Sequence, residues 1–332
     1  MKAVVLLLSS LSCLLSLGQL GQKDVTVKKT LKLMGTRFEV TVVAPNEEIG
    51  YINIDEAVSE IQRIEKIISS WDENSETSLI NKNAGIKPVK VSPELFGLIE
   101  RSIRISEITD GAFDITYASM DNIWKFDGSM ETAPKEEDIR KAVEKIGYQK
   151  IVMDPKNQTV FLPEPGMCIG FGAIGKGYAA DKAKELMVSK DVKGGIINAS
   201  GDLTTWGTKV TGEKWLVGIA NPLSKDKVFS WLPVIESSVA TSGNYEKFII
   251  LNGKKYSHII DPRTGYPTTG INSVSIFAKQ AELCDALATA VFIMGRDVGL
   301  HMINQMDGVE AVVVDSDNKI HKSSGIIFDM NP

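Results

Sequence analysis

The chain has 332 residues, a formal net charge of −5 at pH 7 and only three histidines. This length suits one large domain or two ordinary ones, and it is sufficient to bury a hydrophobic core. The acidic balance, without a run of Lys and Arg interleaved with aromatic residues, argues against nucleic-acid binding.

The first 21 residues have the pattern of an export signal. Met1-Lys2 precede an apolar run from Ala3 to Leu17, and Gly18 supplies a small residue for cleavage. The run is too short for a comfortable membrane span. The alternative is a lipoprotein signal that carries its lipid on Cys13, although Ser10 stands where that motif usually has Leu. We expect an exported protein in the periplasm or on the outer face of the inner membrane, associated with the membrane only if lipid-anchored.

In the next part of the chain, the spacing of apolar side chains predicts a strand pair followed by helices. Thr30–Ala44 alternates like two strands that turn at Met34-Gly35-Thr36, and Ile54–Ser70 has the spacing of an amphipathic helix. Ser92-Pro93 is a typical helix start, with Ser as the cap and Pro in the first turn. The stretch Gly111–Thr116 fits neither period, and we interpret it as a helix end followed by a short strand.

Hairpins and clustered helices fill the rest of the chain. Asn252-Gly253 joins two strands within Glu246–Ile260 and is a strong hairpin signal. Because the helices come in clusters between hairpins, we expect an α+β fold with antiparallel sheets, in a single catalytic domain over residues 23–332. The other predicted elements are helices at Asp138–Ile146 and Tyr178–Met187 and from Ala281 and Val298, a hairpin at Lys150–Leu162, and strands at Trp215–Ala220, Lys227–Val234, Asn272–Phe277 and Val309–Val314, the last closing the chain.

A glycine-rich segment, Gly170–Gly177, opens the helix that runs from Tyr178. Its spacing resembles both a dinucleotide fingerprint and a P-loop, but Gly177 stands where the P-loop needs Ser or Thr, and the next strand lacks a final acidic residue. Glycines still let a phosphate approach backbone N–H groups at a helix N-terminus, with Lys176 as its counter-charge. The alternative is a tight glycine turn without a ligand.

Asp285 and Thr289 lie one turn apart on the helix that begins near Ala281. A spacing of four puts the carboxylate and the hydroxyl on one face, and both are hard oxygen ligands suited to magnesium. The alternative is a helix whose Asp merely stabilises its first turn.

The stretch Tyr256–Pro267 gathers an imidazole, a carboxylate, a guanidinium and several hydroxyls around a turn. We predict a catalytic centre there, with His258 as the candidate base because its unperturbed pKa lies near neutrality. Asp261 would orient His258 or serve in its place. The alternative is a hairpin end whose polar groups satisfy the turn. We interpret Thr241–Tyr245, which precedes this region, as a hydroxyl-rich turn that either holds a phosphate or is purely structural.

Taken together, these segments resemble the ApbE family of flavin transferases, the FAD:protein FMN transferases. The resemblance runs from about Leu33 to Ser316, and it is specific because many weak motifs occur in the family's order. The motifs are Met34-Gly35-Thr36, Ser69-Ser70-Trp71 with Ser75, Gly111–Thr116, Gly172–Asp181, Thr241-Ser242-Gly243, Ser257–Gly265 and Asp285–Thr289.

The resemblance implies an envelope enzyme that splits FAD, releases AMP and attaches FMN through a phosphoester to a Thr or Ser of an acceptor protein. Typical acceptors are subunits of membrane redox complexes. By motif position, the FAD site would be lined by Met34, Trp71, Ala112, Phe113, Asp114, Lys176 and Ile259, and magnesium would be held by Asp285, Thr289 and the backbone carbonyl of Ala173.

The sequence departs from the family pattern at two positions. Many members have Asp where this chain has Gly170, which removes one polar contact to the flavin nucleotide. Some members carry an acidic residue in place of Ala288, so the resemblance leaves the number of metal ions open. The alternative functions are a FAD pyrophosphatase that uses water as the nucleophile, a periplasmic FAD-binding protein without catalysis and, more distantly, a nicotinamide oxidoreductase.

Overall fold

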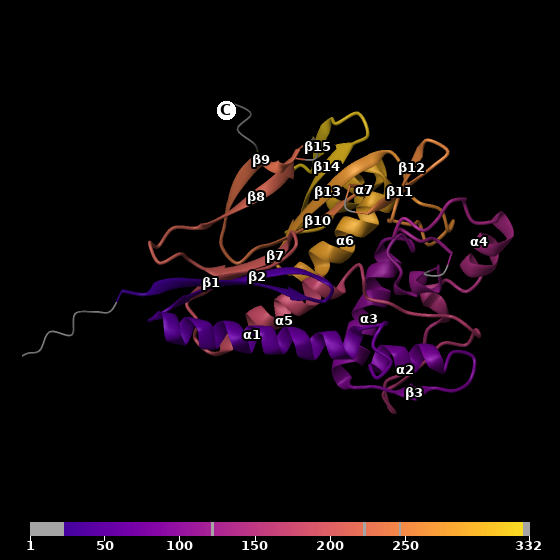
Figure 1. Cartoon of the computed structure of the whole chain (residues 1–332), viewed down its shortest axis with the longest axis horizontal. Helices are drawn as coiled ribbons and strands as arrows, with labels where there is room; N and C mark the ends of the chain where they lie inside the picture. The colour runs from indigo at the N-terminus through magenta and orange to yellow at the C-terminus, as the bar shows by residue number, and fades with distance from the viewer. Residues whose placement is uncertain (1–22, 121–122, 222–223, 246, 328–332) are drawn as a thin grey trace, which may run out of the picture.

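The computed structural model describes residues 23–327 apart from 121–122, 222–223 and 246. The predicted signal peptide at 1–21, with Cys13, therefore lies outside the described residues. The fold is built on an antiparallel eight-stranded sheet (Figure 1). In spatial order its strands are β1 (Val25–Leu33), β2 (Thr36–Ala44), β6 (Gly194–Ala199), β7 (Asp202–Gly207), β10 (Ser238–Gly243), β13 (Ile271–Ala278), β14 (Glu310–Asp315) and β15 (Ile320–Lys322).

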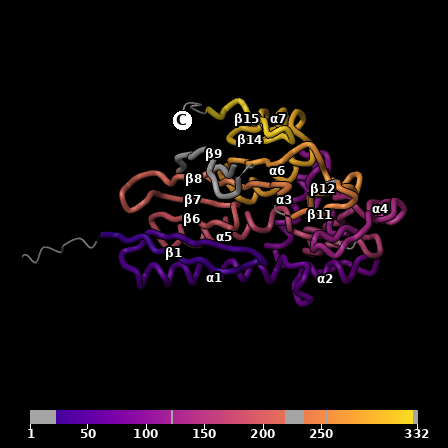
Figure 2. Tube along the Cα trace, turned by 45° about the horizontal axis from the view of Figure 1, so that its top comes forward, coloured from indigo at the N-terminus to yellow at the C-terminus, as the bar shows by residue number. Residues whose placement is uncertain are grey.

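Helices cover one face of this sheet and a two-stranded ribbon covers the other. The helices are α1 (Glu47–Ile68), α5 (Gly175–Ser189) and α6 (Ala281–Met294), followed by α7 (Arg296–Ile303), which packs on α6 and β14. The ribbon consists of β8 (Trp215–Asn221) and β9 (Ser224–Val234). Successive side chains of a strand point to opposite faces, so Ile197 joins the core under the helices while Ile196 packs with Val217 of β8. Figure 2 shows the resulting layers.

Smaller elements pack beside the main sheet, on the side of α2 and α4 in Figure 1. A second hydrophobic core there joins Trp124 and Ile139 to Ile249 and Leu251. The elements are α2 (Glu76–Lys82), β3 (Val89–Lys90), α3 (Pro93–Ile108), η1 (Ile115–Met120), α4 (Glu136–Val143), η2 (Tyr148–Lys150), β4 (Val152–Asp154), β5 (Thr159–Phe161), β11 (Phe248–Leu251) and β12 (Lys254–Ser257).

The α+β class with antiparallel sheets is confirmed, and several local predictions hold. The strand pair turns at Met34-Gly35, and Ser92 caps α3 by accepting a hydrogen bond from Leu95 N at 3.2 Å. The first helix begins earlier than predicted, at Glu47, because the Asn46 side chain accepts a hydrogen bond from Ile49 N and starts it.

Three local predictions are wrong. Thr241-Ser242-Gly243 lie in strand β10 and not in a turn, because Ala240 and its neighbours are buried under α6. Gly111–Thr116 leads into the 3₁₀ helix η1 and not into a strand. The chain does not close at Val314, since β15 returns to pair with β14.

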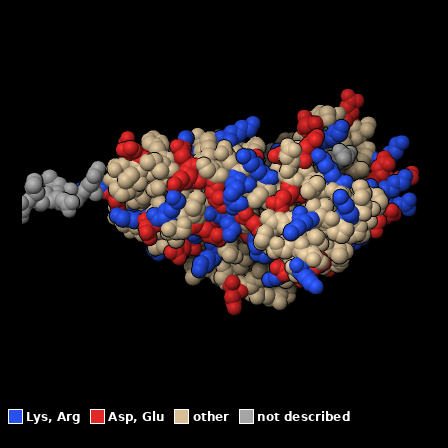
Figure 3. All heavy atoms as spheres, turned by 90° about the horizontal axis from the view of Figure 1, so that it is seen from below, with Lys and Arg blue, Asp and Glu red and all other residues tan. Residues whose placement is uncertain are grey.

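The surface carries charges of both signs. Figure 3 shows Lys and Arg interspersed with Asp and Glu on the face that includes α1. Arg63 of α1 contacts both Glu60 and Glu94, and Lys190 lies 2.8 Å from Glu56. Within the described residues, no helix combines the length and the hydropathy needed to cross a bilayer.

Candidate active site

A cavity of about 1530 Å³ opens where the end of the main sheet meets α5, α6 and the smaller elements. This volume exceeds the roughly 300–1,000 Å³ of a typical small-ligand pocket and suits an extended ligand. The lining includes every predicted site residue except Asp261: Met34, Trp71, Ala112, Phe113, Asp114, Ala173, Lys176, His258, Ile259, Asp285 and Thr289. The structure therefore brings together segments that are more than 250 residues apart in the chain.

Two hairpin turns form one edge of the cavity. Met34 turns β1 into β2 with φ = 48°, and Ser200 turns β6 into β7 with φ = 54°. Because Phe38 pairs with Ala199, the two turns lie side by side, and Thr36 Oγ1 is 2.6 Å from Ser200 Oγ. A positive φ is uncommon for residues other than Gly, so the fold holds both turns at some conformational cost.

The N-terminus of α5 forms a second wall. Gly172, Ala173 and Lys176 all line the cavity. A Cβ on Gly172 would lie 2.5 Å from the Tyr117 hydroxyl, so any larger residue here would displace the end of that side chain. Gly175 N donates to Phe171 O at 2.7 Å and Gly177 N donates to Asp285, so this wall attracts an anion through the charge of Lys176 and the positive end of the helix dipole.

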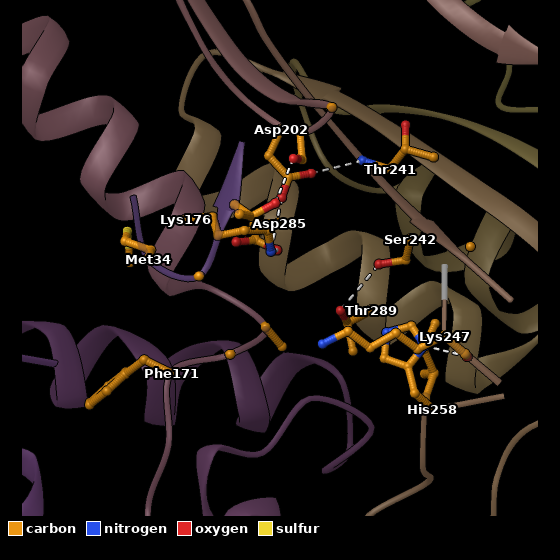
Figure 4. Close-up of a pocket in the computed structure, with 18 of the residues that line it drawn as sticks. Met34, Phe171, Lys176, Asp202, Thr241, Ser242, Lys247, His258, Asp285 and Thr289 are labelled. Atoms are coloured by element: carbon orange, nitrogen blue, oxygen red, sulfur yellow. Dashed lines mark hydrogen bonds and ion pairs between the residues drawn. The ribbon is translucent and has the colours of Figure 1, made fainter. Parts of the chain in front are cut away.

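Two buried carboxylates meet beside Lys176 (Figure 4). Its Nζ lies 3.0 Å from Asp202 Oδ2 and 3.5 Å from Asp285 Oδ1. Asp285 Oδ2 accepts a hydrogen bond from Gly177 N at 3.1 Å, and Asp202 Oδ1 accepts one from Thr241 N at 3.2 Å. Burial, together with the charge of Asp202, raises the pKa of Asp285 to about 7, although Lys176 opposes this shift.

Thr289 lies one turn along α6 from Asp285 and also faces the cavity. Its Oγ1 is 3.3 Å from Ser242 Oγ on β10. Among the described residues, no group of three or more His, Cys, Asp or Glu side chains could hold a metal ion. A metal at Asp285 would therefore need hydroxyl and carbonyl oxygens as further ligands.

His258 follows β12 and lines the cavity from the side opposite Asp202 (Figure 4). Its Nδ1 lies 3.0 Å from the carbonyl oxygen of Lys247. Because a carbonyl can only accept a hydrogen bond, Nδ1 carries the proton and Nε2 keeps its lone pair. Burial lowers the pKa of His258, so the imidazole is neutral at pH 7 and Nε2 can accept a proton.

The structure does not place Asp261 against His258. Its carboxylate binds the Arg263 guanidinium through two contacts of 2.9 Å and also accepts the Arg263 backbone N–H. Asp261 and Arg263 thus anchor the turn, and the ring of His258 is oriented instead by the backbone of Lys247. These contacts support neither predicted role of Asp261, which was to orient His258 or to act as the base in place of His258.

The predicted flavin-site residues differ in how they face the cavity. Trp71 is 86% exposed, whereas Phe113 and Ile259 are buried. Asp114 is also buried, and it accepts hydrogen bonds from Thr116 and from Tyr148 N. Burial raises the pKa of Asp114 despite these bonds. Its carboxylate therefore shapes the backbone of this wall as well as lining the cavity.

Sequence reasoning missed Asp202 and Lys247. Asp202 follows Gly201 at a tight turn, a position from which a side chain can reach a site at the end of a sheet. The Gly201 turn was therefore the sequence feature that could have identified Asp202 as a site residue. The role of Lys247 depends on its backbone carbonyl, for which no side-chain pattern exists.

Known proteins of one family resemble this chain over most of its length. The sequence model of the ApbE family matches residues 34–313. The FAD:protein FMN transferase of Treponema pallidum (strain Nichols) is 30% identical over 312 residues, covering 89% of this chain and 86% of that protein. One from Klebsiella pneumoniae (strain 342) is 30% identical over 266 residues, covering 80% and 82%.

Solved structures give the same result. The ApbE protein of Thermotoga maritima superposes with a TM-score of 0.84 at 31% identity and covers 90% of this chain and 97% of its own. The flavin transferase ApbE of Vibrio cholerae has a TM-score of 0.81 at 23% identity, with 91% and 98% covered, and supports the fold alone.

Proposed function

The chain belongs to the ApbE family, and on that premise we propose that it is a FAD:protein FMN transferase. It would split FAD, release AMP and join FMN through a phosphoester to a Thr or Ser hydroxyl of an acceptor protein. The observation that carries the proposal is a large cavity in which a helix N-terminus, Lys176, a carboxylate pair and a neutral His258 converge.

The donor set around Asp285 fits a magnesium ion. The Asp285 carboxylate, the Thr289 hydroxyl and the Ala173 carbonyl are hard oxygen donors, and all three residues line the cavity. Asp202, Asp285 and Lys176 also carry a total charge of −1 when all are ionised, which favours a cation. Magnesium bound there would neutralise charge on the FAD pyrophosphate.

The residues of the chain have separate tasks in the transfer. Lys176 and the N-terminus of α5 hold the anionic phosphates, which otherwise repel a nucleophile. The acceptor oxygen forms a bond to the FMN-side phosphorus while the bond from that phosphorus to the bridging oxygen breaks, and AMP leaves with that oxygen. Nε2 of His258 takes the proton of the acceptor hydroxyl, a role typically worth a factor of about 10² to 10⁴.

We further propose an exported enzyme whose acceptor is a subunit of a membrane redox complex. The apolar leader before residue 22 supports the export, and the family resemblance supports the acceptor class. Membrane association would depend on lipidation of Cys13.

One experiment separates the candidate functions. The purified protein is incubated with FAD, Mg²⁺ and a candidate acceptor, and the products are separated on a denaturing gel. A fluorescent flavin band at the mass of the acceptor is the expected result. Free FMN and AMP without that band would identify a FAD pyrophosphatase, and unchanged FAD would identify a binding protein.

A further inference from the structure

Asp181 lies on α5, outside the residues that line the cavity, and the chemistry described so far does not use it. Its partly buried carboxylate faces the beginning of α6. Oδ1 accepts a hydrogen bond from Ala281 N at 3.0 Å, and Oδ2 accepts one from Glu282 N at 2.8 Å.

These contacts replace an ordinary helix cap. The first N–H groups of a helix have no partner within the helix, and a side chain of the preceding residue usually satisfies one of them. In α6 that residue is Gln280, whose side chain makes no capping hydrogen bond. Asp181 of the neighbouring helix supplies both acceptors instead, and its negative charge suits the positive end of α6.

A second contact fixes the same pair of helices one turn further along. Gly177 N donates to Asp285 Oδ2, and a Cβ on Gly177 would lie only 2.1 Å from the carbonyl oxygen of Ala281. Gly177 and Asp181 are four residues apart on α5, and Ala281 and Asp285 are four apart on α6. The two helices therefore meet along one face of each, with the carboxylate of Asp285 at the cavity end.

We propose that Asp181 is a positioning residue, which sets the rotation and depth of α6 so that Asp285 and Thr289 face the cavity. The inference rests on the proposed function, since it assigns Asp285 to the metal-dependent step. It goes further in linking a residue outside the cavity to metal affinity. The two hydrogen bonds from Ala281 N and Glu282 N, with the close approach of Gly177 to Ala281, fix α6 against α5, so loss of the cap should shift Asp285 and Thr289 relative to the cavity.

The test compares Asp181→Ala and Asp181→Asn with Asn46→Ala. Asn46 caps α1, and its loss removes a cap far from the cavity. For each protein we would measure FMN transfer against free Mg²⁺, KM for FAD, and the rise in melting temperature that Mg²⁺ causes without FAD. The last measurement does not depend on activity.

We expect Asp181→Ala to raise the half-saturating Mg²⁺ concentration about tenfold or more, the range typical of residues that support metal ligands. KM for FAD should change less than threefold, and the melting-temperature rise caused by Mg²⁺ should shrink. Asp181→Asn should recover part of the Mg²⁺ affinity, because its amide oxygen still accepts a hydrogen bond. Asn46→Ala should lower the melting temperature without changing the Mg²⁺ response.

The inference is overturned if Asp181→Ala and Asp181→Asn bind Mg²⁺ like the unaltered protein, or if their losses match those of Asn46→Ala. The Asn variant, which keeps the size of the side chain, decides the matter if the Ala variant does not fold. Failure of the proposed function is a separate outcome, seen when the unaltered protein transfers no FMN to any acceptor.

Discussion

The close approach of α5 and α6 makes Gly177→Ala a stringent test of the site geometry. The added Cβ would lie 2.1 Å from the Ala281 carbonyl oxygen and 2.8 Å from Glu282 N, whereas ordinary contact begins at 3.4 Å. These neighbours are backbone atoms and cannot rotate away, so α6 must move by about 1 Å. Overpacking of this kind costs about 1–3 kcal/mol, of which the higher helix propensity of Ala returns at most about 1 kcal/mol.

We expect Gly177→Ala to lower the free energy of unfolding by up to about 2 kcal/mol on this basis. FMN transfer should fall by more than about tenfold, because a misplacement of about 1 Å in an active site can cost a factor of 10². Urea unfolding and gel fluorescence after incubation with FAD, Mg²⁺ and acceptor measure the two effects.

Gly97→Ala is the matched control for this substitution. Gly97 also lies within a helix, α3, but the nearest atom to its added Cβ is the mobile end of Arg101 at 3.4 Å. Ala should therefore raise the free energy of unfolding by up to about 1 kcal/mol and leave transfer unchanged. The reasoning is refuted if both substitutions shift stability in the same direction, or if Gly177→Ala keeps full activity.

Four further predictions concern the ionisable groups. Asp285→Ala should abolish Mg²⁺-dependent transfer, and full activity in that variant would disprove the metal assignment. His258→Ala should slow transfer by about 10² to 10⁴ while FAD binding, measured by flavin fluorescence, stays within a few-fold. Because burial lowers the pKa of His258 from its ordinary value near 6.5, and the neutral ring is the base, transfer at saturating Mg²⁺ should be lost with falling pH at a lower pH than a free imidazole would give. Burial raises the pKa of Asp181 to about 6 from 3.8, with Glu282 adding to the shift and Lys184 opposing it. The folded state therefore binds the proton more tightly than the unfolded chain, and as the pH rises from about 4 to about 6 the unaltered protein should lose stability relative to Asp181→Asn in parallel urea titrations.

Short motifs identified most of the cavity lining in the sequence. The glycine run before α5, the Asp285–Thr289 spacing and the polar stretch around His258 each reflect a local chemical need that survives without knowledge of the fold. Asp261 illustrates the limit of this reasoning. Its proximity to His258 in sequence suggested a partnership, whereas the turn directs its carboxylate to Arg263.

The sequence was less informative for strands that are buried on both faces of the sheet. Strand β7 is almost entirely buried and so shows no alternation, which left Asp202 without a recognisable element. Strand β10 has small and hydroxyl-bearing side chains because α6 packs closely over it, and the same residues are typical of turns. In both strands tertiary packing, and not local propensity, decided the structure.

The pairing of β2 with β6 has a consequence for the order in which the chain folds. Val42 pairs with Gly195, so about 150 residues must be made before the N-terminal hairpin can join its neighbour. Until then one edge of β2 offers unpaired backbone groups to any other strand. Because the N-terminus emerges first, the chain would depend on chaperone protection through most of its synthesis or export. Fragments that end before residue 194 should aggregate, because they lack the strand that pairs with β2.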